Sequence, residues 1–312
     1  MKNLSRRKFI HFSTATTALL LLPNIHTAAM NTITSMSSDI LTRPIPKCPQ
    51  ERIPIVGMGT WQTFDVGNNA TERTNLKKVL SAFIEMGGTL LDSSPMYGSS
   101  EEVLGDLAVE LDVLKQLFMA TKVWTTGKNA GIDQMKASMQ KMQCNPMDLM
   151  QVHNLLDFKT HIKTLQRWKA EGKIRYIGIT HYTDSYHDDL VRLIESESLD
   201  FVQFNYSILS RHAEKQLLPA AQANGVATLI NRPYESGSLF RQVKGKQLPE
   251  WVKEYGINSW GQFFLKFILS HPAVTCVIPA TSKEHHLRDN MGAGFGEMPD
   301  DKVREEMSKV LI

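Results

Sequence analysis

The sequence predicts a single (β/α)8 TIM barrel of the α/β class over residues 53–312, and three observations favour this fold. Eight short apolar runs follow one another along the chain, and stretches with helical periodicity lie between them. A span of about 260 residues is also the length that eight strand–helix units need. An open, doubly wound sheet is the alternative, but it does not need eight strands so evenly alternated.

The predicted strands are short and apolar on both faces, as is typical of parallel sheets. In chain order they cover residues 55–60, 89–92, 118–123, 149–153, 176–180, 201–205, 226–231 and 274–278. Between the first two, Leu76, Val79, Leu80 and Phe83 are spaced as one helical face. Gly87-Gly88 then marks the end of that helix. No shift in composition marks a second domain.

The first 30 residues predict a secretory signal peptide. A basic region with Arg6-Arg7 precedes a short apolar region and a run of small residues that ends at Ala29. The paired arginines resemble a bacterial twin-arginine signal, which would take the protein to the periplasm through the Tat translocon. The apolar region is shorter than the ~20 residues that span a bilayer, so no stable membrane insertion is expected after cleavage. A basic N-terminus without signal function and a signal anchor are the alternatives, and residues 31–52 are predicted to be a linker or N-terminal arm.

Charge and cysteine content exclude several classes of function. The formal net charge is +3, but the first 30 residues hold four basic residues and no acid, so the remaining 282 carry −1. A nearly neutral body argues against a nucleic-acid surface built on bulk charge. Cys48, Cys144 and Cys276 lie far apart without a Cys-x-x-Cys motif, which favours neither a zinc site nor a redox pair and leaves their pairing open.

Four polar residues at or just past the ends of the second, third and fourth strands form the candidate catalytic site, because TIM barrels carry their active sites at the carboxyl ends of the strands. A lysine at the end of an apolar strand needs a partner when buried, and Asp92 can pair with Lys122. The resulting cation is expected to lower the pKa of Tyr97 from its usual ~10, so that the phenol can donate a proton to a carbonyl oxygen. His153 can direct the same oxygen. A proton donor without a carboxylate nucleophile or metal cluster implies that a cofactor supplies a hydride.

The motifs around these four residues resemble those of the aldo-keto reductase family. The resemblance covers about residues 50–310, and its motifs follow one another on the predicted strands: GMGTW at 57–61, Asp92 followed by SSPMYGSSE at 93–101, ATKV at 120–123, MDLMQVH at 147–153, GKIRYIGI at 172–179 and VIPATS at 277–282. It implies a (β/α)8 barrel with NADP(H)-dependent reduction of an aldehyde or ketone. Asp92, Tyr97, Lys122 and His153 would be its catalytic tetrad.

A phosphate-binding segment is expected after the last strand, because barrels of this class often bind phosphate there at a helix N-terminus. Thr281 and Ser282 can cap that helix, while Lys283 and Arg288 add positive charge. The resemblance implies that this segment holds the adenosine phosphate and that Asn290 contacts the adenine. An outward, solvated Arg288 is the alternative.

One further position bears on the choice between NADP(H) and NAD(H). His286 stands where many relatives carry arginine, which weakens the case for a strong preference for the 2′-phosphate, although NADP(H) stays ahead of NAD(H). The adjacent His285-His286 lacks the i, i+4 spacing of a helical metal pair, so no metal is expected.

Two departures from the family concern the nicotinamide. Relatives usually end the fifth strand in Ser-Asn, which holds the carboxamide, whereas this chain has Thr180-His181 and keeps the matching Gln203. Where relatives commonly place a stacking aromatic after the seventh strand, either Tyr234 stacks from a shifted loop or Arg232 replaces the stacking. A strand-end salt bridge is the further alternative for Arg232.

Three aromatic residues just past strand ends form the candidate substrate wall: Trp61, Trp124 and Tyr182. Core packing is the alternative for each of them. The leading hypothesis is therefore an exported reductase of small carbonyl compounds with Tyr97 as general acid. A low-turnover cofactor-binding sensor or partner subunit, and a sugar enzyme working by internal oxidation and reduction, are the competing hypotheses.

Overall fold

The computed structural model describes residues 39–311. The predicted signal peptide therefore lies outside the described residues, as does the first part of the predicted linker. No helix in the described range is long and apolar enough to cross a membrane. Cys48, Cys144 and Cys276 are free thiols, and Cys276 is buried.

Eight parallel strands form one sheet in the order β10-β9-β8-β7-β6-β5-β4-β3. The strands are β3 (Met58–Gly59), β4 (Leu90–Asp92), β5 (Phe118–Val123), β6 (Met147–Val152), β7 (Ile174–Thr180), β8 (Phe201–Asn205), β9 (Ala227–Asn231) and β10 (Cys276–Val277). Parallel bridges from Val56 to Val277 and from Gly59 to Ala280 join the first strand to the last. The predicted (β/α)8 barrel is confirmed. Its two closing strands are shorter than expected because single bridges replace a continuous ladder there.

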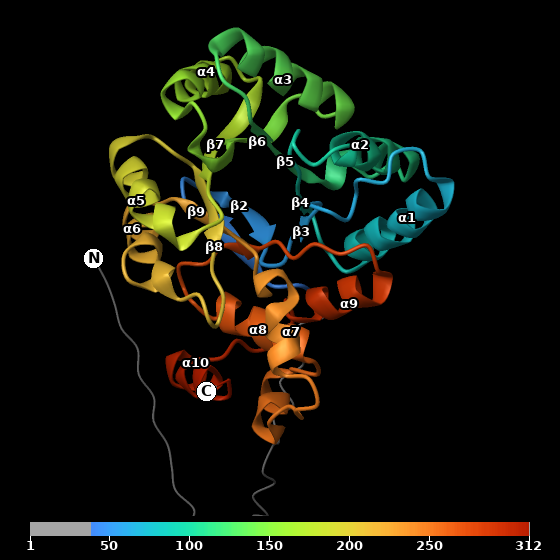
Figure 1. Cartoon of the computed structure of the whole chain (residues 1–312), viewed down its shortest axis with the longest axis vertical. Helices are drawn as coiled ribbons and strands as arrows, with labels where there is room; N and C mark the ends of the chain where they lie inside the picture. The colour runs from blue at the N-terminus through green and yellow to red at the C-terminus, as the bar shows by residue number, and fades with distance from the viewer. Residues whose placement is uncertain (1–38, 312) are drawn as a thin grey trace, which may run out of the picture. The chain divides into compact units, whose positions relative to one another are not determined.

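Helices surround the sheet and cover its outer face (Figure 1). They are α1 (Ala70–Glu85), α2 (Ser100–Glu110), α3 (Lys128–Lys141), α4 (Phe158–Ala170), α5 (His187–Ser196), α6 (Leu217–Ala223), α7 (Ser238–Gln242), α8 (Trp260–Leu269), α9 (Glu284–Gly292) and α10 (Asp301–Lys309).

The first helix shows how local sequence sets these elements. The Asn69 side chain caps α1 by accepting hydrogen bonds from the backbone N–H groups of Thr71 and Glu72. The apolar face predicted for this helix is buried, as expected. A Cβ on Gly88 would lie 2.3 Å from the Phe83 ring, so only glycine allows the chain to turn this closely under the helix.

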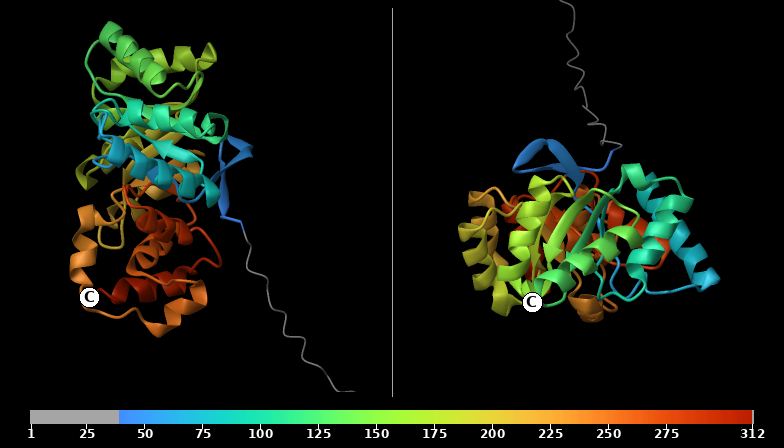
Figure 2. Two further views of the ribbon diagram at one scale, coloured as in Figure 1. Left: turned by 90° about the vertical axis from the view of Figure 1, so that its right-hand side faces the viewer. Right: turned by 90° about the horizontal axis from the view of Figure 1, so that it is seen from above.

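A two-stranded antiparallel hairpin of β1 (Thr42–Ile45) and β2 (Cys48–Pro54) lies across one end of the barrel (Figure 2). This segment was expected to be a linker or arm up to residue 52, and it is ordered because Ile45 and Ile53 bury their side chains. They join a core cluster inside the barrel that includes Leu90, Phe118 and Phe201. This end of the barrel is thus filled by apolar side chains, which leaves the opposite, carboxyl end for polar chemistry.

Candidate active site

A buried ion pair forms the base of the site at the carboxyl ends of β4 and β5. Lys122 Nζ lies 2.6 Å from Asp92 Oδ2 and donates a second hydrogen bond to the Ser93 carbonyl at 2.6 Å. The Lys122 side chain is completely buried. Burial lowers the pKa of Lys122, but the charge of Asp92 and contact with Tyr97 raise it by more, so its pKa lies above the usual value. The predicted pair is formed, and the ammonium stays charged.

Tyr97 lies over this pair, with Lys122 Nζ 5.1 Å from the centre of its ring. Burial raises the pKa of Tyr97 above its usual value by more than the charge of Lys122 lowers it. The predicted net lowering of this pKa was therefore wrong, although the sign of the Lys122 contribution was right. The consequence is a phenol that keeps its proton at neutral pH beside a cation that stabilises the phenolate once the proton has left.

His153 follows β6, and its ring meets that of Tyr97 edge to face at 5.8 Å between centres. Its Nδ1 lies 2.9 Å from Ser94 Oγ, which in turn accepts a hydrogen bond from the Met96 backbone N–H at 3.3 Å. The Ser94 oxygen can accept two hydrogen bonds, so the direction of this contact depends on the tautomer of the ring; when the Ser94 hydroxyl donates to Nδ1, the imidazole proton lies on Nε2. Burial and the charge of Lys122 lower the pKa of His153 to about 2, so the ring is neutral.

Two glutamines hold the other oxygen of Asp92. Gln151 Nε2 and Gln203 Nε2 each donate to Asp92 Oδ1 at 2.9 Å. Gln203 was predicted from the resemblance as a contact of the nicotinamide carboxamide, and its bond to Asp92 was not predicted; Gln151 and Ser94 were not predicted at all. The sequence marked Gln151 as a polar residue within the apolar run of residues 149–152, and the structure places it in register with Lys122 on β5. Together these donors fix the carboxylate in one orientation.

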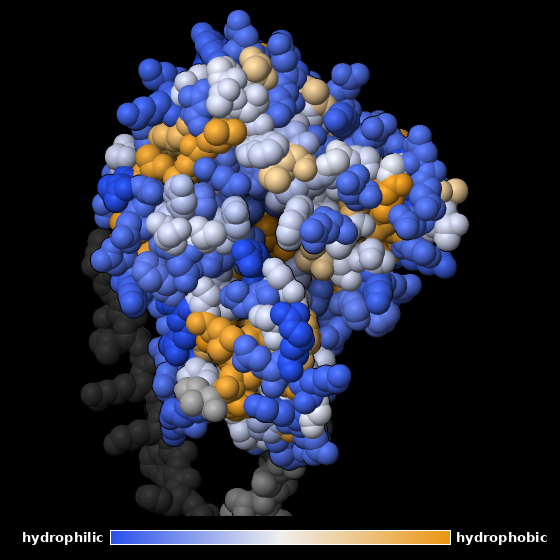
Figure 3. Space-filling model, in the orientation of Figure 1, coloured by the Kyte–Doolittle hydropathy of each residue, from blue (hydrophilic) through white to orange (hydrophobic). Residues whose placement is uncertain are grey.

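A cavity of about 1390 Å³ opens above these residues. Figure 3 shows apolar surface in the hollow at the centre of this face. Trp61, Trp124 and Tyr182 line the cavity and are 48%, 40% and 46% exposed, so they lie at its mouth. Eleven of the predicted site residues line it, namely these three with Asp92, Tyr97, His153, Thr180, Gln203, Arg232, Thr281 and Asn290.

Other predicted site residues lie off the cavity. Lys122 is beneath Asp92, and Ser282 and Lys283 are exposed to solvent at the start of α9. The His181 ring stacks on Tyr186 with 3.6 Å between centres. Arg288 forms ion pairs with Glu85 at 2.8 Å and Glu284 at 2.9 Å, as the outward alternative anticipates. Roles for these side chains in cofactor binding stay predictions.

The loop after β9 separates the two side chains proposed for nicotinamide stacking. The Tyr234 hydroxyl donates to Asn290 Oδ1 at 2.6 Å, and its ring packs on Phe240 with 4.9 Å between centres. The Arg232 guanidinium instead lies over the Tyr182 ring, 5.7 Å from its centre. Tyr234 is thus tied to α9 and α7, while Arg232 lies beside a residue of the cavity mouth.

Unpartnered polar atoms test whether the cavity fits a polar ligand. Of the six buried side-chain atoms without a hydrogen bond in the described residues, four belong to residues that line this cavity: Thr63 Oγ1, Asn154 Oδ1, Asn231 Oδ1 and Arg232 Nε. Leaving one such atom unpaired costs about 1–3 kcal/mol. A cavity above the usual range of roughly 300–1,000 Å³ therefore has both the room and the free hydrogen-bonding groups for a dinucleotide with a small substrate.

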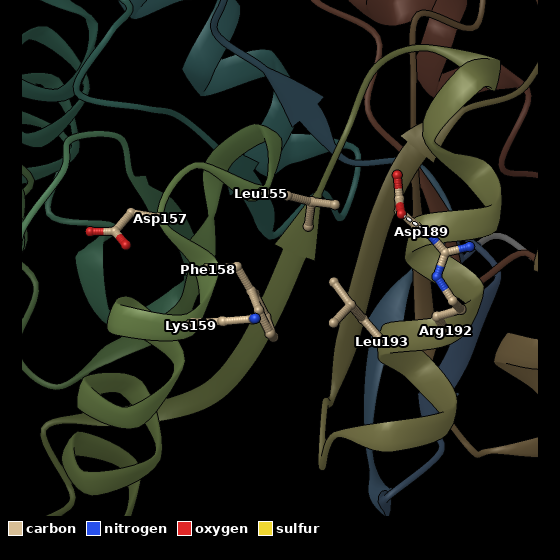
Figure 4. A pocket seen from close by; sticks show the side chains of 7 residues that line it. All are labelled: Leu155, Asp157, Phe158, Lys159, Asp189, Arg192 and Leu193. Carbon is tan, nitrogen blue, oxygen red and sulfur yellow. Dashed lines mark hydrogen bonds and ion pairs between the residues drawn. The ribbon is translucent and has the colours of Figure 1, made fainter.

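A smaller hollow of about 420 Å³ lies between α4 and α5 (Figure 4). Leu155, Phe158 and Leu193 supply its apolar wall, and an ion pair between Asp189 and Arg192 lies at its rim. It contains none of the predicted site residues, so the larger cavity is the candidate active site.

Comparison with known proteins gives matches to one family over most of the chain. The model of the Aldo/keto reductase family matches residues 55–310. The chain is similar to the methylglyoxal reductase YeaE of Escherichia coli (strain K12), with 27% identity over 246 residues that cover 76% of this chain and 84% of that protein. It is also similar to the glyoxal reductase of Bacillus subtilis (strain 168), with 25% identity over 264 residues covering 83% and 88% of the two chains. The structure of a Klebsiella pneumoniae aldo-keto reductase in complex with NADPH shares the fold, with a TM-score of 0.73, 23% identity and coverage of 87% of this chain and 95% of that one.

Proposed function

This chain belongs to the aldo/keto reductase family, and we propose that it reduces an aldehyde or ketone to an alcohol, with NADPH as hydride donor and Tyr97 as general acid. The observation that carries the proposal is the buried Lys122–Asp92 pair directly beneath Tyr97 and beside His153. A neutral phenol and a neutral imidazole then face the same cavity.

Each side chain has a defined part in moving one proton. The Tyr97 hydroxyl donates its proton to the carbonyl oxygen of the substrate. Lys122 stabilises the phenolate that remains, and Asp92 keeps Lys122 charged. His153 donates a hydrogen bond from Nε2 to the same oxygen and so orients the carbonyl. Reduced nicotinamide, when bound, supplies the hydride that forms the new C–H bond.

The cavity offers groups for the cofactor along its length. Gln203 and Thr180 lie near the tetrad. Thr281 lies two residues before Lys283, the N-cap of α9, and Asn290 lies within that helix. NADP(H) is favoured over NAD(H), and related proteins of the family bind NADP and NADPH in their solved structures. Separate titrations of the purified protein with NADPH and NADH test this preference, and equal affinities would contradict it.

The reductase proposal is tested by Tyr97→Phe. Loss of a general acid is expected to lower kcat for small aldehydes by at least about 10²-fold, while the dissociation constant of NADPH changes little. Tyr255→Phe is the matched control, because Tyr255 is a tyrosine that does not line the cavity. Wild-type turnover by Tyr97→Phe would overturn the proposal, and a tightly held cofactor without turnover in the wild-type chain would favour a binding subunit.

We propose further that residues 1–30 direct export to the periplasm by the twin-arginine route. The support is the sequence alone, namely paired arginines before a short apolar region and a small-residue run. That route carries folded proteins, so a cofactor bound in the cytoplasm could travel with the chain. Arg6→Lys combined with Arg7→Lys is expected to keep the protein in the cytoplasm, and unchanged export in fractionated cells would refute the proposal.

A further inference from the structure

Arg232 is the one lysine or arginine among the described residues that line the active-site cavity. It directly follows β9, and its guanidinium lies over the Tyr182 ring at the mouth. Its one hydrogen bond is a long contact of 3.4 Å from Nη2 to Ser236 Oγ. The Nε atom is buried without any partner. Four of the five guanidinium N–H groups thus have no hydrogen bond within residues 39–311.

The carboxylates that line the cavity, and the one in the same loop as Arg232, have other partners. Glu235, three residues away, accepts a hydrogen bond from Ser207 Oγ at 2.6 Å. Asp289, also on the cavity, accepts from Ser259 Oγ at 2.7 Å and Gln262 Nε2 at 3.0 Å. Asp92 is paired with Lys122. No ion pair with Arg232 is formed inside the described part of the chain, so the strand-end salt bridge considered from the sequence is not made there.

The backbone holds Arg232 in place at an energetic cost. Its φ is +51°, and Glu235 and Ser236 in the same loop have φ values of +50° and +52°. A non-glycine residue in this left-handed region is strained, and such strain persists where the surroundings over-determine it, most often at ligand sites. A partly buried, unpaired guanidinium carries a desolvation cost of its own unless a counter-charge is supplied.

We infer that Arg232 binds a negatively charged group, a carboxylate or a phosphate, of the ligand that fills this cavity. The planar guanidinium favours both, because each offers two oxygens in the spacing of its N–H fork. The group has two possible sources, an acidic carbonyl substrate or the phosphates of the dinucleotide. The inference rests on the proposed function for the identity of these ligands, but binding itself can be measured without turnover.

The test compares Arg232→Gln and Arg232→Lys with the wild-type chain. Arg241→Gln is the matched control, because it removes the same charge from exposed residue 241 of α7, which does not line the cavity. The first arm measures the dissociation constant of NADPH by fluorescence titration. The second arm measures kcat/KM for 4-carboxybenzaldehyde and for its neutral methyl ester, which differ in the negative charge.

Loss of one charge-assisted contact is expected to change the affected constant by roughly tenfold or more in Arg232→Gln and by less in Arg232→Lys. A change in NADPH affinity alone assigns the phosphates, and a loss of the preference for the carboxylate over its ester assigns the substrate. Values within twofold of Arg241→Gln in both arms would overturn the inference. If the wild-type chain binds NADPH but turns over neither aldehyde, the proposed function fails, and calorimetric binding of 4-carboxybenzaldehyde to the NADPH complex replaces the second arm.

Discussion

Ser94 provides the sharpest test of how the active site orients His153. Its buried hydroxyl lies 2.9 Å from His153 Nδ1 and accepts from the Met96 N–H. The proposed mechanism needs this hydroxyl to donate to Nδ1, which places the imidazole proton on Nε2, facing the substrate oxygen. Ser94→Ala removes that donor and leaves Nδ1 unsatisfied inside the protein. The Nε2–H tautomer then loses its support.

The expected size of the effect follows from one hydrogen bond. A net intramolecular hydrogen bond contributes about 1 kcal/mol, and an unsatisfied buried acceptor costs about 1–3 kcal/mol. A loss of about 1 kcal/mol of transition-state stabilisation lowers kcat/KM by about 5–10-fold, since about 1.4 kcal/mol corresponds to a factor of ten. The dissociation constant of NADPH is expected to stay within about twofold, because the hydroxyl lies between two protein groups.

Ser93→Ala is the matched control in the same assay. Ser93 is equally buried, and its hydroxyl accepts from Thr60 Oγ1 at 2.9 Å without contacting His153. Steady-state kinetics with a small aldehyde should therefore separate the two variants, while their unfolding midpoints fall by similar amounts. Equal kcat/KM in the two variants, or wild-type kcat/KM in Ser94→Ala, would refute the reasoning.

Three further predictions concern pH and packing. Burial lowers the pKa of His153 to about 2 and raises that of Tyr97. A plot of kcat/KM against pH should therefore be flat from about pH 5 to about pH 9 and fall only as Tyr97 loses its proton. An inflection near the usual histidine pKa of ~6.5 that disappears in His153→Gln would contradict this. Burial also lowers the pKa of Lys266 to about 8, so above that pH the unfolded chain holds a proton that the folded chain lacks. In urea unfolding, the free energy of unfolding of the wild type should therefore rise by about 3 kcal/mol relative to that of Lys266→Met between about pH 8 and about pH 10.4. The same dependence of this free energy on pH in both proteins would be the negative result. Gly105→Ala should destabilise the protein by about 1–3 kcal/mol in thermal unfolding, because a Cβ there would lie 2.1 Å from the Lys141 carbonyl oxygen, and an unchanged midpoint would show that α2 and α3 can move apart.

Much of the active site could be predicted because strand ends converge in a barrel. Asp92, Lys122 and His153 each end or follow a short apolar run, and the topology brings such positions to one rim. The contacts between side chains from distant segments were harder to foresee. Arg288 pairs with Glu85, 203 positions away, and Asp92 binds Gln203, 111 positions away, which no local pattern marks.

The sequence by itself determined the barrel and the identity of its polar rim, because hydrophobic periodicity and strand-end chemistry are local properties of the chain. Only the tertiary structure decided the direction of the Tyr97 pKa shift, the contact of Ser94 with His153 Nδ1 and the absence of an ion pair at Arg232 within the described residues. Each of these depends on how deeply a group is buried and which partners reach it. Burial and partners are set by packing among residues far apart in the chain, and therefore they appear only once the chain has folded.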